Sequence, residues 1–226
     1  MAASALVSGG KDSIYAAYLS ETQGWPVEEL VTLEPEEADS MLFHTPNLAM
    51  VPLQAEAWGK RHRAVPVRGT GEAAELAALE HGLSGGNGPI VTGAIESSYQ
   101  WSRLLRIAGR VGRRLYAPLW RVPPRRVVEE EISAGLDIRF VHLAAEPLSP
   151  DLLGERLDRA RLEDLGRRSA TVRTLHVAGE GGEYETLVVD APFFRSRLVL
   201  DEIERRVEPT TARLVVRRAH LKSKRS

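Results

Sequence analysis

The sequence predicts an α/β fold with a doubly wound parallel sheet, and three observations support this prediction. A short apolar run, residues 5–7, leads into a glycine turn and then into an apolar stretch with helical spacing, residues 14–19. Strand-like and helix-like segments go on alternating as far as residue 119, which is typical of parallel sheets. Beyond Pro123 and Pro124 several strands follow one another, which predicts a smaller C-terminal α+β domain.

We therefore expect two domains, residues 1–122 and residues 123–226. In the first domain strands are expected at 5–7, 27–33, 64–67, 89–93 and 115–119, and helices at 14–19, 48–58, 72–83 and 96–111. Ser13 and Asn47 are expected to cap two of these helices. In the second domain helices are expected at 125–134 and 151–165, and strands at 136–143, 171–177, 184–189, 197–203 and 212–219. The basic residues near the end are expected on a disordered, solvated tail: Arg213, Arg217, Arg218, Lys222, Lys224 and Arg225.

Composition excludes several classes of protein. The net charge of −1 does not call for nucleic acid or an anionic membrane as a partner. No apolar run approaches the ~20 residues of a membrane-spanning helix, and no signal peptide is evident, so we expect a cytoplasmic protein. The sequence contains no cysteine. This excludes disulfides, cysteine-bound metals and thiol nucleophiles. Any nitrogen that the protein transfers should then arrive as free ammonia or from a partner.

The loop from Ser8 to Ser13 is the most informative stretch. Its order of strand, glycines and helix directs backbone N–H groups and a helix N-terminus at an anion. Gly9 and Gly10 permit close approach to a phosphate, and Lys11 adds a mobile positive charge. Asp12 makes sense beside phosphates if Mg²⁺ lies between them. The alternative is an ordinary turn in which the glycines serve only the backbone.

This string is neither a Walker A loop nor the Rossmann glycine motif, because the spacing differs from both. It resembles the pyrophosphate-binding loop (PP-loop) of the N-type ATP pyrophosphatases. The resemblance implies that ATP is cleaved between its α- and β-phosphates and that a carboxylate or carbonyl oxygen is adenylated.

A second informative string runs from Gly179 to Thr186 and carries three carboxylates, on Glu180, Glu183 and Glu185. We expect Glu183 and Glu185 on the same face of a strand. Like charges this close favour a cation, which predicts a site for Mg²⁺, ammonium or a cationic substrate group. A solvated acidic loop with a glycine bend is the alternative.

Two further strings carry candidate residues. The segment 93–103 combines a strand end with a helix start, capped by Ser97 or Ser98, whose N-terminus is expected to receive ATP phosphates or the carboxylate to be activated. In the segment 39–44, His44 is by itself more typical of a structural histidine. Leu33 ends an expected strand, so its carboxyl end should lie near the Ser8–Ser13 loop.

Taken together, these strings resemble the diphthine–ammonia ligases, enzymes that complete diphthamide on translation elongation factor 2. The shared strings are 8–13, 39–44, 92–95 with Ser97, Tyr99, Gln100 and Arg103, then 117–120 and 179–186. They occur in order and span most of the chain. The resemblance implies an ATP- and Mg²⁺-dependent enzyme that forms an acyl-adenylate, which ammonia attacks to give the amide, AMP and pyrophosphate.

The resemblance also implies roles for particular residues. Lys11, Asp12 and Glu183 are the expected catalytic residues, with Asp12 as the metal ligand. The expected nucleotide-binding residues are Ser8, Gly9, Gly10, Lys11, Asp12, Ser13, Leu33, His44, Gly93, Ala94 and Ile95. The expected substrate-binding residues are Glu96, Ser97, Tyr99, Gln100, Arg103, Glu180, Gly181, Gly182, Glu183, Tyr184 and Glu185.

Two alternatives remain open from the sequence. One is another adenylating PP-loop enzyme, acting on a tRNA base or a small-molecule carboxylate. The near-neutral charge and the missing cysteine weaken its tRNA-thiolating version, and a nucleic-acid partner is not expected. The other is a non-catalytic protein that only binds adenine nucleotides, against which the Lys11-Asp12 pair and the glutamates argue.

Overall fold

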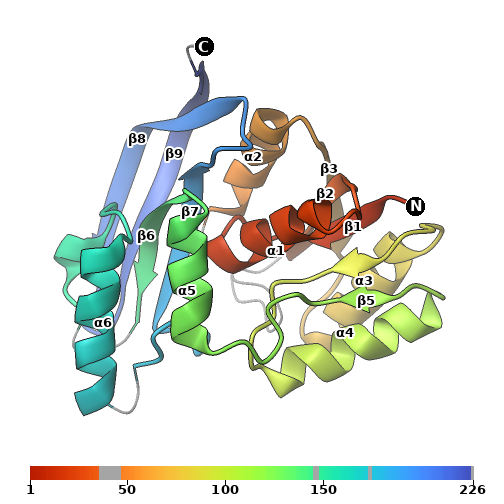
Figure 1. The fold of residues 1–226 in the computed structure, drawn as a ribbon, viewed down its shortest axis with the longest axis horizontal. Helices are drawn as coiled ribbons and strands as arrows, with labels where there is room; N and C mark the ends of the chain where they lie inside the picture. The colour runs from red at the N-terminus through yellow and green to blue at the C-terminus, as the bar shows by residue number, and fades with distance from the viewer. Residues whose placement is uncertain (36–46, 145–147, 173–174, 225–226) are drawn as a thin grey trace.

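Two β-sheets organise the chain, and the structure, a computed structural model, describes residues 1–35, 47–144, 148–172 and 175–224. The first sheet is parallel, with the strand order β3-β2-β1-β4-β5 (Figure 1). Its strands are β1 (Ala3–Leu6), β2 (Val27–Pro35), β3 (Arg61–Val67), β4 (Ile90–Val91) and β5 (Leu115–Tyr116). Its helices are α1 (Lys11–Thr22), α2 (Val51–Trp58), α3 (Glu72–Leu83) and α4 (Ser98–Arg110).

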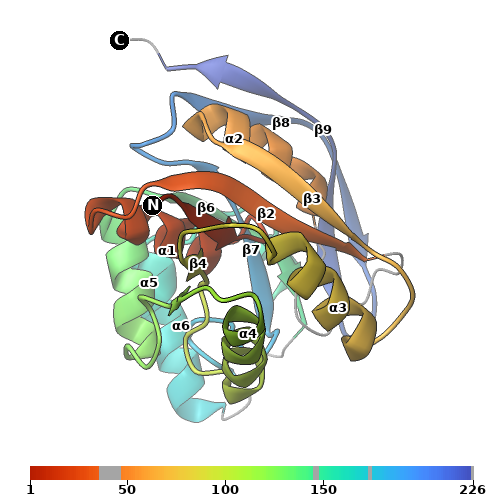
Figure 2. The same ribbon diagram turned by 90° about the vertical axis from the view of Figure 1, so that its right-hand side faces the viewer.

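Helices cover both faces of this sheet, which confirms the doubly wound fold. Residues of β2 contribute to the cores on both faces: Val27 and Leu30 belong to the cluster with α1 and α2, whereas Val31 and Leu33 belong to the cluster with α3 and α4. Both faces of β2 are therefore covered, as is typical of a central strand in a parallel sheet. Figure 2 shows α2 on one side of the sheet and the pair α3 and α4 on the other.

The second sheet is antiparallel and has the order β7-β6-β9-β8. Its strands are β6 (Asp137–Leu143), β7 (Tyr184–Asp190), β8 (Ser196–Val207) and β9 (Ala212–Ser223). Two helices accompany it, α5 (Pro124–Ser133) and α6 (Arg159–Thr171), and short 3₁₀ turns lie at η1 (Leu48–Met50) and η2 (Pro150–Leu152). The expected C-terminal α+β part is thereby confirmed.

One hydrophobic cluster joins the two halves. It contains Ile14 of α1, Val127 and Val128 of α5, Phe140 of β6 and Leu187 of β7. Figure 1 shows α1 lying between the parallel sheet on one side and α5 with β7 on the other. The expected domain boundary at 122/123 falls between β5 and α5 and stays a prediction, because the core runs across it.

Two elements expected in the second half are wrong. The helix expected at 151–165 is replaced by η2, a turn at Gly154 with φ 81°, and a bridge between Arg139 and Arg156. Helix α6 begins only after Asp158, whose carboxylate accepts the Arg161 N–H at 2.9 Å. Because α6 runs on to Thr171, no strand occupies the described part of 171–177.

The expectation of a disordered basic tail is also wrong as far as residue 224. Strand β9 pairs with β8 from Ala212, opposite Val207, to Ser223, opposite Ser196. Leu214 and Val216 are buried on one face of β9. The basic side chains at positions such as 213 and 217 alternate with them, so a pleated strand accounts for the charges.

Asn47 holds this strand instead of capping a helix. It adopts a left-handed conformation, with φ 63°, and makes no side-chain cap. Its Nδ2 donates to the Leu214 carbonyl at 2.9 Å, and its Oδ1 accepts the Val216 N–H at 2.8 Å. The predicted cap is therefore wrong, and Asn47 ties the start of α2 to β9.

Within the described ranges, no helix is long and apolar enough to cross a bilayer. The longest helices, α4 and α6, have 13 residues each, short of the ~20 that a membrane span requires.

Candidate nucleotide site

The Ser8–Ser13 loop joins β1 to α1 at the carboxyl end of the parallel sheet. Strand β1 lies between β2 and β4, so the winding of the sheet reverses at this point. Ligands of such folds bind in the crevice that the reversal opens. A cavity of about 110 Å³ lies there, which we call the first cavity. The expected site residues that it brings together are Ser8, Gly10, Asp12, Ser13, Gly93, Ala94, Ile95, Gln100 and Glu180.

Strand β7 of the second sheet holds this loop in place. Gly9 has φ 84°, a conformation that favours glycine, and its carbonyl accepts the Val188 N–H at 3.0 Å. The Gln54 amide bridges the same two segments, donating to Gly9 O at 2.9 Å and to Val188 O at 2.7 Å. The Lys11 N–H donates to the Thr186 hydroxyl at 3.2 Å. The loop is therefore built by both halves of the chain.

The Ser13 hydroxyl serves the loop itself. It accepts the Ser8 N–H at 3.3 Å and donates to the Gly10 carbonyl at 3.1 Å. Gly10 occupies the N-cap position of α1 without a side-chain cap, so the expectation that Ser13 caps this helix is wrong.

Gly93 lets the end of β4 touch the first turn of α1. A Cβ atom at this position would lie 2.6 Å from the Asp12 carbonyl carbon and 2.7 Å from the Ser13 nitrogen. Real Cβ atoms do not approach backbone atoms this closely. The absence of a side chain therefore sets the distance between the two walls of the first cavity.

Lys11 is buried behind the loop, in contact with two carboxyl groups. Only 1% of its side chain is exposed, and its Nζ lies 2.6 Å from Asp12 Oδ1 and 3.8 Å from Glu131 Oε2. Glu131 comes from α5 and is fully buried. Asp12 is 31% exposed and reaches the first cavity. One ammonium thus faces one buried and one accessible carboxyl.

Burial and charge act in opposite directions on these groups. Burial lowers the pKa of Lys11, but the attraction of Asp12 and Glu131 outweighs it and raises the pKa above its usual value. Burial raises the pKa of Glu131 well above the ordinary carboxyl range, and the charge of Lys11 offsets only part of this rise. Lys11 is therefore a permanent cation in the wall of the site.

A second cavity of about 60 Å³ lies on the other side of the loop. It shares Ser8, Gly10 and Asp12 with the first cavity, so the two spaces are neighbours. The remaining walls are Lys11, Ala178, Tyr184, Glu185 and Thr186. Burial raises the pKa of Tyr184, whose hydroxyl donates to the Val177 carbonyl at 2.7 Å. The second cavity is small and carries the loop lysine with two carboxylates.

The N-terminus of α4 is already occupied by a carboxylate of the chain. Glu180 accepts the N–H groups of Ile95 at 3.0 Å, Glu96 at 2.7 Å and Ser97 at 3.0 Å. Ser97 caps the helix by accepting the Gln100 N–H at 3.3 Å, which confirms the expected cap. The expectation that this helix N-terminus receives phosphates or a substrate carboxylate is therefore wrong for the structure described. Glu180 fastens the second half to the first cavity instead.

Glu183 and Glu185 have separate surroundings. Strand β7 begins after Glu183, whose carboxylate folds back and accepts the N–H groups of His176 at 3.1 Å and Gly181 at 3.0 Å. The expected pairing of the two glutamates on one strand face is therefore wrong. Glu185 lines the second cavity, and its Oε1 lies 3.6 Å from Nδ1 of the buried His142.

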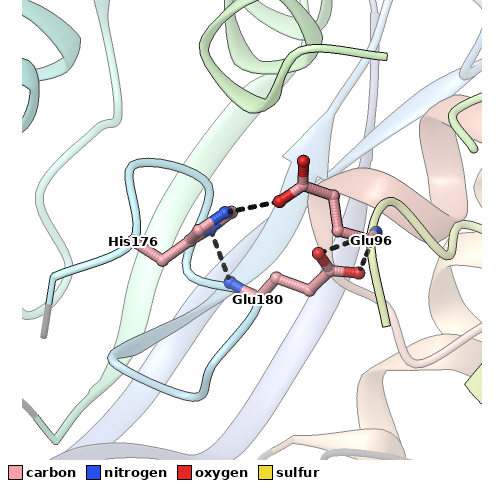
Figure 3. Close-up of side chains that lie close together, drawn as sticks. All are labelled: Glu96, His176 and Glu180. Atoms are coloured by element: carbon pink, nitrogen blue, oxygen red, sulfur yellow. Dashed lines mark hydrogen bonds and ion pairs between the residues drawn. The ribbon is translucent and has the colours of Figure 1, made fainter. Parts of the chain in front are cut away.

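Glu96, His176 and Glu180 form a cluster of side chains (Figure 3), and Glu180 also lines the first cavity. His176 Nε2 lies 3.4 Å from Glu96 Oε2, and the Glu180 N–H points to His176 Nδ1 at 3.3 Å. Their ligand atoms lie within 4.8 Å of one another, a spacing compatible with a metal ion. The oxygens of Glu180 and both ring nitrogens of His176 already have protein partners, so this cluster acts as a latch between the halves.

Several expected site residues lie elsewhere. Tyr99 and Arg103 stack on each other, with Arg103 Cζ 3.3 Å from the ring centroid, and both bind Glu72 of α3. Leu33 is buried in the core between the sheet and α3 and α4. His44 lies outside the described residues. Gly181 and Gly182 shape the turn before β7 and are not among the cavity residues described above. Roles for all of these stay predictions.

Sequence reasoning missed three residues that build the loop: Gln54, Glu131 and Thr186. A signal existed for two of them. Gln54 is the polar member of the buried helical set Val51, Gln54, Ala55 and Trp58, and Glu131 shares the buried face of α5 with Val127 and Val128. A polar group at an apolar position of a helix indicates a buried partner. The signal does not say which partner.

Comparisons with known proteins match both halves. Residues 1–115 match the family described as "Diphthamide synthase N-terminal domain", and residues 123–221 match "Diphthamide synthase C-terminal domain". The chain belongs to the diphthamide synthase family. The two matched stretches cover the parallel sheet with its loop and the antiparallel sheet with β7, so family membership extends over both walls of the site.

Individual relatives agree. The diphthine–ammonia ligase of Bos taurus is 31% identical over 233 residues, covering 90% of this chain and 84% of the relative. That of Schizosaccharomyces pombe is 30% identical over 88% of this chain, and the chain spans only 36% of its length. A solved structure, a predicted subunit of tRNA methyltransferase from Methanocaldococcus jannaschii DSM, matches 85% of this chain with 16% identity and a TM-score of 0.46.

Proposed function

We propose that this protein is a diphthine–ammonia ligase, which uses ATP to convert the diphthine carboxylate of translation elongation factor 2 into an amide. One observation carries the proposal: the Ser8–Ser13 loop and Gly93 form a cavity at the reversal point of the sheet, in a chain of the diphthamide synthase family. Elongation factor 2 works in the cytoplasm, so we assign the reaction to that compartment.

The chemistry takes two displacements. A carboxylate oxygen of diphthine attacks the α-phosphorus of ATP, and the bond to the β-phosphate oxygen breaks, so pyrophosphate leaves. Ammonia then attacks the acyl carbon, AMP leaves with the bonding electrons, and one proton of the nitrogen is released. Lys11 supports the first displacement, because a buried, permanent cation stabilises the charge that develops on pyrophosphate.

Asp12 is the residue that fits Mg²⁺. Its carboxylate supplies hard oxygen ligands in the wall of the first cavity, where a metal ion would share it with phosphate oxygens. Bound Mg²⁺ would withdraw charge from the phosphates. Asp12 also contacts Lys11, so the same residue would hold both the lysine and a bound ion.

We place ammonium in the second cavity rather than at Glu180 or Glu183. Glu180 and Glu183 accept backbone N–H groups, which an ammonium ion would have to displace. Glu185 lines the second cavity together with Asp12, beside the loop. A cavity of about 60 Å³ is of the right order for a molecule the size of water. We assign Glu185 to bind ammonium and accept its proton.

Product analysis tests the function. The protein is incubated with Mg-ATP, ammonium and diphthine-bearing elongation factor 2, and one component is left out at a time. We expect AMP and pyrophosphate only with the modified factor, and the amide only with ammonium. Equal AMP formation with a tRNA or a small carboxylate would show that the protein is an adenylating enzyme with a different substrate. ADP, or no turnover with any acceptor, would leave a nucleotide-binding protein.

A further inference from the structure

Glu131 is a buried carboxyl group for which packing alone gives no reason. Its side chain is 0% exposed, and neither carboxyl oxygen has a hydrogen-bond partner among the described residues. Its neighbours on the buried face of α5 are Val127 and Val128. Burying a polar group without a hydrogen bond is destabilising, so an apolar residue at this position would stabilise the packing of the helix better.

The charged group that Glu131 meets is the ammonium of Lys11. Oε2 lies 3.8 Å from Nζ, beyond hydrogen-bonding distance but close enough for the carboxyl group and the ammonium to interact electrostatically. Asp12 holds the same Nζ at 2.6 Å, and Asp12 itself lies close enough to Glu131 to raise the pKa of Glu131 further. Lys11 lines the second cavity but not the first, so its ammonium is drawn to the side of the loop where α5 lies.

We propose that Glu131 is a positioning residue for Lys11: it holds Nζ behind the loop, so that the charge meets pyrophosphate as it departs and contributes little to binding of intact ATP. The inference rests on the proposed function, because the role of Lys11 is assigned there. Through Glu131 on α5, the second half of the chain would take a direct part in the chemistry. This role is separate from the structural contact that Glu180 makes between the halves.

The test uses Glu131→Gln, which keeps the shape and replaces the carboxyl group by an amide, and Glu131→Asp, which keeps the carboxyl group and shortens the side chain. Glu129→Gln is the matched control, since Glu129 lies on the same helix in an exposed ion pair with Arg125. We expect Glu131→Gln to lower kcat for AMP formation by about ten- to a hundredfold, because misplaced catalytic groups cost that much. The KM for ATP should change less than the kcat, and Glu131→Asp should recover part of the rate.

A double-mutant cycle separates positioning from simple packing. If Glu131 acts through Lys11, Glu131→Gln adds no further loss once Lys11→Met is present. Losses that multiply in the double variant, or a Glu131→Gln variant with wild-type kcat, would overturn the proposal. Thermal unfolding shows whether each variant is folded. If Glu131→Gln does not fold, the kcat of Glu131→Asp relative to the wild type still tests the proposal.

A crystal structure of Glu131→Gln supplies a readout that does not need turnover. We expect Lys11 Nζ to move by more than about 0.5 Å, the tolerance of a productive site. An unmoved Nζ would contradict the positioning role. If no acceptor supports AMP formation, the proposed function fails, while the position of Nζ still decides this inference.

Discussion

Gly93 shows how a single missing side chain sets the geometry of the site. The Cα of Gly93 faces the backbone of Asp12 and Ser13. A methyl group on this Cα would have no room, because it would collide with that backbone. The contact is with main chain rather than a flexible side chain, so neither wall of the first cavity can yield without moving β4 or α1.

We expect Gly93→Ala to destabilise the protein by about 1–3 kcal/mol, the usual cost of overpacking, and to weaken ATP binding by about tenfold as the walls separate. Titration calorimetry with ATP and thermal unfolding measure the two effects. Gly109→Ala is the control: a Cβ there meets nothing within 4 Å, so alanine should stabilise α4 by about 0.5–1 kcal/mol. Unchanged ATP binding in Gly93→Ala would contradict this explanation.

Residue-level prediction succeeded where the chemistry is local. The Ser8–Ser13 loop and Gly93 are recognisable because a glycine turn between strand and helix has a local cause. Gln54 and Glu131 are not, because each acquires its meaning from a partner far along the chain, the Gln54 bridge to Val188 spanning 134 residues. The prediction that Glu183 and Glu185 share one strand face is wrong for a different reason. The glycine bend turns the Glu183 carboxylate back onto its own loop, before the strand begins.

At the scale of elements, strands β2 and β3 are tied by an ion pair that makes stability depend on pH. Hydrogen bonds from Arg63 hold the pKa of Glu29 below its usual value, against the opposing effect of burial. Arg63 Nη2 lies 2.8 Å from Glu29 Oε1, and the glutamate is 14% exposed. A carboxyl whose folded pKa is lowered contributes stability above its unfolded pKa of about 4.3 and loses it as the pH falls through the folded pKa.

We therefore expect Arg63→Gln to lower the free energy of unfolding at pH 7 by about 1 kcal/mol, and this deficit to shrink below about pH 4.3. Urea unfolding at a series of pH values measures it. Arg61→Gln is the matched control, since the Arg61–Glu28 pair joins the same strands at 2.8 Å but is exposed. A deficit that stays constant down to pH 3 would show that Glu29 does not carry the effect.

Elements of the parallel half were predictable because apolar runs and helical spacing are written into short windows, and α3 begins and ends where expected. In the second half the deciding partners are distant. Strand β9 looks like a charged tail until β8 lies beside it, and the helix expected from residue 151 cannot form across Gly154. Turn geometry and strand pairing overruled local spacing there.

At the scale of the whole molecule, Glu180 is the fastening between the two halves. Its carboxylate accepts three backbone N–H groups at the start of α4, where the helix dipole also favours a negative charge. Hydrogen bonds to a charged group contribute about 1.5–3 kcal/mol, so this contact is large for one side chain.

We expect Glu180→Gln to lower stability by about 1–3 kcal/mol, because the amide accepts with one oxygen and carries no charge. The specific readout is hydrogen exchange of the amides at positions 95–97, which should speed up while exchange in α3 stays the same. Glu56→Gln, an exposed position on α2, serves as the control. Unaltered exchange at 95–97 would mean that the latch does not form in solution.

The bond from the Lys11 amide to Thr186 has a consequence for the way this protein is made. The two residues are 175 positions apart, and a chain leaves the ribosome with its N-terminus first. At about 5–20 residues per second, the loop waits roughly 9–35 s before β7 emerges to hold it. A nascent chain therefore lacks the finished Ser8–Ser13 loop until β7 has been synthesised and has emerged to hold it.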